Sequence, residues 1–375
     1  APCSTSPATP DPPIDQGLLG MTAVAPPITD HAPDLVTRVR EGGLSGSKNL
    51  LLGIGVLSLI VTIVMGFVEH WSLGFLSAYL TGWMYGLSLC LGALFFVMIQ
   101  HLTRAGWSVT VRRVAAHMAA NVWIFVPLAI PLLYNYQTLW GAWADADPLD
   151  TVVAGKTSYL DATFFFIRFA VYFAFWIFVA RWFRACSLKQ DETGDPQLSL
   201  KMSYRAAPCL LGFALTVTFG SIDWMMTLDP HWYSTIFGGC FVSFLALSPL
   251  LIKGMGRAGY LKDCINTEHY HDLGKLLFAF VVFWTYTSFS QYFLIWFANI
   301  PEETAWFALR KKDGWETVFY ILAFGHFLIP FAFLLGRHIK RNKFALGVGA
   351  GYMLVLHWVA LHFYIDTAAA HHAHG

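Results

Sequence analysis

Nine stretches of the sequence are each long and apolar enough to cross a lipid bilayer. A helix needs about 20 apolar residues to match a hydrocarbon core of about 30 Å. The stretches are 49–68, 74–100, 113–134, 158–180, 206–228, 232–252, 273–299, 315–336 and 344–364. Inside hydrocarbon the backbone must satisfy its own hydrogen bonds, so such segments fold as helices. The sequence therefore predicts an all-α polytopic membrane protein with about nine transmembrane helices.

The charge content agrees with a lipid-embedded chain. Charged residues make up 13% of the sequence, whereas about 25% is usual in soluble proteins. The net charge of +1 lacks the basic excess typical of nucleic-acid binding. We expect lipids, and no nucleic acid, among the partners.

The basic residues alternate between the two sides of the predicted helices. Of the 24 Lys and Arg residues, 19 fall before the first stretch or after an even-numbered one, and Arg168 lies inside a stretch. The opposite side holds only Lys156, Arg310, Lys311 and Lys312. Cytoplasmic loops carry the excess of Lys and Arg. This pattern predicts a cytoplasmic N-terminus and a C-terminus on the outer side.

The two ends of the chain differ from the rest. Residues 1–48 are polar and rich in Pro and Ala, without the apolar run of a signal peptide. They are expected to form a cytoplasmic tail. Residues 365–375 contain His371, His372 and His374 and are expected to form a His-rich tail on the outer side, without a metal site.

No motif for catalysis or for a metal centre is found. None of the six cysteines forms a C-x-x-C pair, and iron–sulfur or structural zinc sites need clustered thiolates. There is also no nucleophile–base pair, phosphate loop or dinucleotide fingerprint. We therefore predict no catalytic residue, cofactor ligand or metal ligand in this chain.

Ionisable residues at membrane depth are the first candidates for function, because they are costly there. Asp161 and Arg168 are seven residues apart, on one face of a predicted helix, with Arg168 about 10 Å deeper. They either tether two helices or form part of a proton or ion path. Asp223 comes near the end of the stretch 206–228 and begins a turn with aromatic anchors and an Asp229-Pro230 signal.

Four histidines, His117, His326, His357 and His362, fall within predicted helices. A bis-histidine haem needs two histidines on each of two helices, and only the last helix has two, five residues apart. Neutral, hydrogen-bonded histidines are the better interpretation. His326 and His357 are also candidates for a proton relay, because imidazole titrates near neutral pH.

The predicted helix 273–299 has polar residues at its inner end and again farther along. His271, Asp272 and Lys275 form either a solvated cluster or a mouth for protons. Deeper in the helix, Ser288 and Gln291 either line a hydrated file or hold helices together by hydrogen bonds.

Two segments carry a resemblance to a known family. One is Asp-Trp-Met-Met-Thr-Leu-Asp-Pro-His-Trp-Tyr-Ser-Thr at 223–235, and the other is 271–304, which begins His-Asp-Leu-Gly-Lys. Together with 315–326 and the basic Gly-Arg-His-Ile-Lys-Arg at 336–341, they resemble the second NrfD-like, polysulfide-reductase-type membrane subunit of bacterial alternative complex III. The resemblance covers roughly 49–364.

The resemblance implies a fold and a location. Residues 74–228 and 232–364 would form two four-helix bundles, with 49–68 as a peripheral transmembrane helix. The protein would lie in the bacterial inner membrane. Members of the family usually have a tenth helix, for which this sequence has no further apolar stretch.

The resemblance also implies a function within a complex that oxidises quinol. Quinol would bind a paralogous membrane subunit. Electrons would pass through iron–sulfur clusters and c-type haems in partners, namely an iron–sulfur/molybdopterin-like large subunit and multihaem cytochrome c subunits. This cofactor-free chain would support assembly and offer a proton route. That route would run from His271, Asp272 and Lys275 through Ser288 and Gln291 to an outer half with Asp161, Arg168, Asp223, His326 and His357.

Two other functions remain open from the residues alone. Proline-bearing stretches permit a secondary transporter, since transporters use broken helices. Alternatively, the chain is itself a quinol-binding catalytic subunit, with Asp161, Asp223 or His357 as the base.

Overall fold

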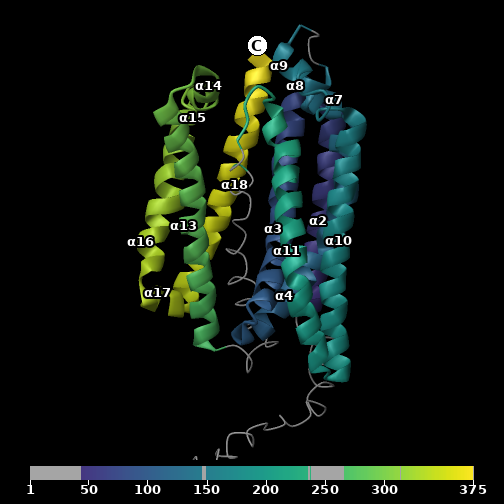
Figure 1. Cartoon of the computed structure of the whole chain (residues 1–375), viewed down its shortest axis with the longest axis vertical. Coiled ribbons are helices and arrows are strands. Elements are labelled where there is room, and N and C mark those ends of the chain that lie inside the picture. Colours follow the sequence, from purple (N-terminus) through teal and green to yellow (C-terminus); the bar gives the residue numbers. More distant parts are fainter. Residues whose placement is uncertain (1–43, 146–148, 235–236, 238–265, 313, 375) are drawn as a thin grey trace, which may run out of the picture. The chain divides into compact units, whose positions relative to one another are not determined.

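A computed structural model describes residues 44–145, 149–234, 237, 266–312 and 314–374 (Figure 1). Throughout these residues the chain is helical, with turns between helices and no strand. Eight helical segments are long and apolar enough to cross a membrane: 49–68, 73–102, 111–134, 162–193, 196–228, 267–298, 315–335 and 343–369. This confirms the prediction of an all-α, multi-pass membrane protein.

Eight of the nine predicted stretches correspond to these segments. The remaining one, 232–252, lies outside the described residues except for 232–234 and 237, and it stays a prediction. Residues 1–43 of the predicted tail also lie outside them. The structure differs at residue 44, because α2 (Leu44–Val68) begins within the predicted tail.

The chain divides into two compact units, residues 1–52 and 53–375. Of the first unit, the structure describes only residues 44–52, which belong to α2. In the second unit, nearly every side chain of α2 from Gly53 to Val68 is exposed, and most of these side chains are apolar. Such a helix is suited to a lipid environment. Its peripheral place in a larger fold stays a prediction.

The first half of the second unit is built around α3 (Leu73–Leu102). It packs against α4 (Val109–Ala119), α11 (Pro196–Trp224) and α18 (Lys343–His374), and α11 packs against α10 (Ala162–Thr193). The face of α3 at Leu76, Leu80, Met84 and Leu87 is completely buried. Residues spaced by three and four lie on one side of a helix, so this face forms the core.

Short signals in the sequence set the ends of these helices. The side chain of Asp161 caps α10 by accepting the N–H of Phe164 at 2.9 Å. α10 ends at Gly194, whose φ of +66° suits a residue without Cβ. Asp195 then caps α11, and Pro196 occupies its first turn, where proline is tolerated.

The segment after α4 is broken into short pieces. They are a 3₁₀ turn η4 (Ala120–Ile124), α5 (Phe125–Leu128), α6 (Ile130–Tyr134), α7 (Tyr136–Leu139), α8 (Gly141–Ala144) and α9 (Thr151–Ala154). Pro127 and Pro131 lie in this run, and each removes a helical hydrogen bond. The predicted span 113–134 is therefore an irregular helix.

The second half contains α13 (Thr267–Ala298), α14 (Pro301–Leu309), α15 (Trp315–Tyr320), η8 (Ile321–Leu328), α16 (Ile329–Leu335) and α17 (Arg337–Arg341). α13 packs against α16 and α17, and α18 packs against η8 and α16 as well as α3 (Figure 1). η8 is π-helical and ends two residues before Pro330. π-helical turns are rare in proteins as a whole, and those that occur are often found at functional sites.

The C-terminal region departs from the predicted tail. Helix α18 continues to His374, and Ile365, Ala368 and Ala369 are buried. Alanine is the strongest helix former, and the run of alanines after Thr367 extends the helix while its small side chains pack closely. Only the backbone is described for His371, His372 and His374.

Candidate functional site: buried polar centres

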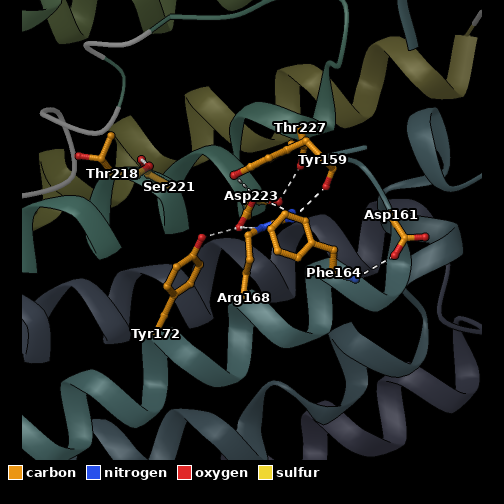
Figure 2. Close-up of polar contacts among 9 residues, drawn as sticks. All are labelled: Tyr159, Asp161, Phe164, Arg168, Tyr172, Thr218, Ser221, Asp223 and Thr227. Carbon is orange, nitrogen blue, oxygen red and sulfur yellow. Dashed lines mark hydrogen bonds and ion pairs between the residues drawn. The ribbon is translucent and has the colours of Figure 1, made fainter. Parts of the chain in front are cut away.

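A buried ion pair joins α10 to α11. Arg168 lies two turns into α10, and Asp223 lies near the end of α11. The Arg168 guanidinium forms a bidentate contact with the Asp223 carboxylate, with Nε 2.8 Å from Oδ2 and Nη2 3.0 Å from Oδ1 (Figure 2). Arg168 is 7% exposed and Asp223 is 1% exposed. Bidentate pairs of this kind are among the stronger charged hydrogen bonds.

Two tyrosines complete the bonding of the carboxylate. Tyr159 donates its hydroxyl to Oδ1 at 2.8 Å, and Tyr172 donates to Oδ2 at 2.9 Å. Arg168 Nη1 donates to the Tyr159 carbonyl at 2.9 Å. A buried carboxylate is tolerated only when it is paired and hydrogen-bonded. Here each oxygen of Asp223 accepts two hydrogen bonds, which meets that requirement.

Aromatic rings surround this centre. The Arg168 guanidinium lies 3.9 Å from the ring centre of Tyr159 and 4.4 Å from that of Phe164, within the range of cation–π attraction. Trp224 follows Asp223 in the sequence, and its ring centre is 5.1 Å from that of Trp83 on α3 and 5.9 Å from that of Trp176 on α10. The residues beside the ion pair thus hold three helices together.

The hydroxyl of Tyr159 remains a donor over the whole physiological range. Burial raises the pKa of Tyr159, and the negative charge of Asp223 raises this pKa further. A neutral phenol donates to a carboxylate, whereas a phenolate would repel it. The tyrosine therefore stays available as a hydrogen-bond donor to Asp223.

The structure corrects the predicted placement of Asp161 and Arg168 on one face of a helix. Asp161 precedes the first residue of α10, and its exposed side chain caps the helix, while Arg168 pairs with Asp223. The prediction extended the helix too far toward the N-terminus, so it placed Asp161 on the same face. Arg168 joins α10 to α11 through Asp223, so the tether interpretation fits Arg168, whereas Asp161 caps α10.

A second polar centre contains two histidines. His357 on α18 is 3% exposed, and its Nε2 is 2.8 Å from Ser88 Oγ on α3. His326 in η8 is completely buried, and its ring stacks on Trp284 with centroids 3.8 Å apart. Neither ring nitrogen of His326 has a hydrogen-bond partner among the described residues. The prediction of hydrogen-bonded histidines therefore fits His357, and for His326 it stays a prediction.

The polar residues on α13 do not form a continuous line along that helix. At one end Lys275 pairs with Asp272 at 2.6 Å, and His271 Nδ1 lies 3.7 Å from Glu268, which also pairs with Arg341. From Leu276 to Trp284 every residue is apolar or aromatic. Ser288 lies 13 residues beyond Lys275, about 20 Å along the helix. The proposed inner mouth and middle are thus separated on α13.

Ser288 and Gln291 instead line a cavity of about 580 Å³ formed by α13, α14, α15, η8 and α18. Its wall is mainly aromatic and includes Trp284, Phe319 and Phe363. Gln291 is 7% exposed, and its Nε2 has no partner among the described residues. This cavity was not predicted, because it depends on how the helices pack.

Sequence reasoning also missed the burial of Arg310, which it counted as a basic residue of a loop. Arg310 is 2% exposed and donates to the carbonyls of Trp306 at 3.0 Å and Tyr364 at 3.2 Å. Burial lowers the pKa of Arg310 to about 9, so it stays positively charged at neutral pH. Arg310 is followed by Lys311 and Lys312, and nothing in the sequence indicates that it alone of the three is buried.

Among the residues that the structure describes, no group of three or more His, Cys, Asp or Glu side chains could hold a metal ion. The candidate site is therefore the pair of buried polar centres, one fully hydrogen-bonded and one partly unpartnered, together with the cavity beside the second. No protein-family model matches the chain, and no curated protein matches it.

Proposed function

We propose that this chain is a cofactor-free membrane subunit of a quinol:electron-acceptor oxidoreductase of the alternative complex III type. In this proposal it supports assembly with a quinol-binding paralogue in the bacterial inner membrane. Its partners would be an iron–sulfur/molybdopterin-like large subunit and multihaem cytochrome c subunits, which carry the redox centres.

The observation that carries the proposal is the place of Asp223. This residue opens the segment 223–235 that resembles the family, and its carboxylate holds Arg168, Tyr159 and Tyr172. The same segment contributes Trp224 to the packing of α3, α10 and α11. Because the oxygens of Asp223 already accept these hydrogen bonds, we infer that this residue stabilises the fold and does not act as a catalytic base.

Proton conduction is the second part of the proposal, and it rests on the histidines. His326, with two unpartnered ring nitrogens, and His357, bonded to Ser88, are both buried within membrane-spanning helices. An imidazole ring can accept a proton at one nitrogen and release one from the other. The route we propose runs through this histidine centre, whereas Arg168 and Asp223 hold the helices together.

Purification through a tag on this chain tests the proposal. Membranes of the native host are solubilised in a mild detergent, and the haem spectrum and subunit masses of the purified material are measured. We expect c-type haem and a large iron–sulfur protein in a fixed ratio to this chain. A folded chain that purifies alone and without colour would contradict the proposal and would favour a secondary transporter.

A further inference from the structure

The cavity beside α13 has the size and lining of a site for an apolar ligand. Its volume is about 580 Å³, and most of its lining residues are aromatic, including Phe289, Phe319 and Phe363. Ligand pockets of about 300–1,000 Å³ with mainly apolar walls and a few polar groups are typical of small-molecule sites.

The cavity opens on the flank of a membrane-spanning helix. Tyr286 and Phe289 both line it, and they are 69% and 62% exposed. The neighbouring α13 residues Phe293 and Phe297 are also exposed. In a membrane this apolar flank faces hydrocarbon, so a ligand would reach the cavity from the lipid.

One wall of the cavity offers a hydrogen-bond donor. The Gln291 side chain is more than nine-tenths buried, and its Nε2 has no acceptor among the described residues. A buried donor without an acceptor is unfavourable. This amide therefore points to a ligand that carries an acceptor oxygen in addition to its apolar part.

A positive charge lies at the rim of the cavity. The exposed ammonium of Lys311 donates to Tyr292 Oη at 2.7 Å and lies 5.3 Å from the ring centre of Phe319. Tyr292 and Phe319 both line the cavity. This charge favours a ligand whose apolar part is joined to an anionic group.

The order of these groups along α13 matches the order of groups in a phospholipid. About 20 helical residues cross the hydrocarbon core, so counting from Lys275 the core extends to Ile295. Gln291 then lies about 6 Å inside this boundary, and the Lys311 ammonium meets the hydroxyl of Tyr292, the next residue toward the boundary. An acyl chain, an ester carbonyl and a phosphate follow one another in the same direction.

We propose that the cavity binds an anionic phospholipid, with one acyl chain among the aromatic rings. An ester carbonyl accepts from Gln291 Nε2, and the phosphate lies at Lys311. This inference does not depend on the proposed function, because it rests on the cavity, the unpartnered amide and the charge at the rim.

Photolabelling of the full-length chain tests the inference. The protein is placed in phosphatidylcholine nanodiscs with phosphatidylglycerol that carries a diazirine in one acyl chain, and labelled residues are mapped by mass spectrometry. We expect labels at Phe289, Phe319 or Phe363. Unlabelled phosphatidylglycerol should compete, and Lys311→Gln should reduce the labelling by about fivefold. Lys312→Gln, the matched control, should leave it within about twofold.

A filled cavity supplies the second arm of the experiment. Ala323 lines the cavity and is exposed, so Ala323→Trp should block the site and abolish labelling without disturbing buried packing. An unlabelled cavity in the wild-type chain would overturn the proposal. So would labelling unchanged in Ala323→Trp, or equal competition by phosphatidylcholine, since the site would then have no preference for an anionic headgroup.

Discussion

The Arg168–Asp223 centre and the His326–His357 centre are both buried within membrane-spanning helices, yet they differ in hydrogen bonding. Each carboxylate oxygen of Asp223 accepts two hydrogen bonds. His326 has no partner for either ring nitrogen among the described residues. A buried charge is too unfavourable to leave unpaired, whereas a neutral imidazole costs much less. The comparison separates a centre whose charges are fully hydrogen-bonded from one in which a buried ring has unpartnered nitrogens among the described residues.

The largest effect is expected when the charge of Arg168 is removed. Arg168→Met leaves the Asp223 carboxylate buried without its cation, and the free energy of unfolding should fall by about 3–5 kcal/mol. Thermal unfolding of the purified chain in detergent measures this loss. Arg181→Met, which changes an exposed arginine of the same helix, is the control and should change stability by less than about 0.5 kcal/mol. Equal effects of the two substitutions would contradict a structural role for Arg168.

A smaller effect is expected for one tyrosine hydroxyl of the same centre. Tyr172→Phe removes a donor to the carboxylate and keeps the ring, so the free energy of unfolding should fall by about 1.5–3 kcal/mol. The same thermal unfolding measurement applies. Tyr204→Phe is the control because Tyr204 is 72% exposed. No difference between Tyr172→Phe and the control would mean that the hydroxyl does not stabilise Asp223.

The histidines should respond differently from each other. His357→Phe breaks the contact with Ser88 and should lower the free energy of unfolding by about 1 kcal/mol. His326→Phe removes no hydrogen bond among the described residues and keeps a ring against Trp284, so stability should change little. If the proton route is correct, His326→Phe should still slow quinol oxidation by the purified complex. Full activity in a stable His326→Phe variant would contradict the route.

The smallest effect is expected for an ion pair exposed to solvent, His231 with Asp150. This pair extends the comparison from buried centres to the protein surface. His231 Nε2 lies 2.7 Å from Asp150. The pKa of Asp150 lies below its ordinary value of 3.8, chiefly because the backbone N–H of Val153 donates to the carboxylate, with His231 adding to the effect. A lowered pKa gives stability that is present above pH 3.8 and is lost as the pH falls through the lowered pKa of the folded state.

Asp150→Asn keeps a capping side chain and removes this titration. The difference in unfolding temperature between wild type and Asp150→Asn should be small at about pH 5 and smaller still toward pH 3. A difference that grows as the pH falls would have the wrong sign. A difference as large as that of Arg168→Met would remove the distinction between exposed and buried pairs.

The sequence predicts the helices more reliably than the contacts between them. Apolar runs identify eight spans, but they underestimate the length of two helices, because α10 continues to Thr193 and α11 begins at Pro196, beyond the predicted limits at 180 and 206. Arg168 stands out because it is charged within an apolar run. Its partner could not be read from the same helix, because Asp223 is 55 residues away and the pairing depends on how α10 and α11 pack.

Other features of the structure could not be predicted from the sequence for similar reasons. The π-helical turn at Ile321–Leu328, the burial of Arg310 and the cavity at Gln291 all follow from tertiary packing. The extension of α18 beyond residue 364 was partly readable, because its alanines favour a helix. The drop in hydropathy at Asp366 hid that signal. Local sequence patterns therefore predict where polar residues occur, but not what they contact.

A double-mutant cycle on Arg168 and Asp223 tests most directly the claim that these residues form a structural tether. The unfolding free energies of Arg168→Met, Asp223→Leu and the double variant are compared with that of wild type. We predict a double variant more stable than either single variant, with a coupling energy of about 2 kcal/mol or more. Losses that add within about 0.5 kcal/mol would show that the two residues act independently, which would contradict the tether.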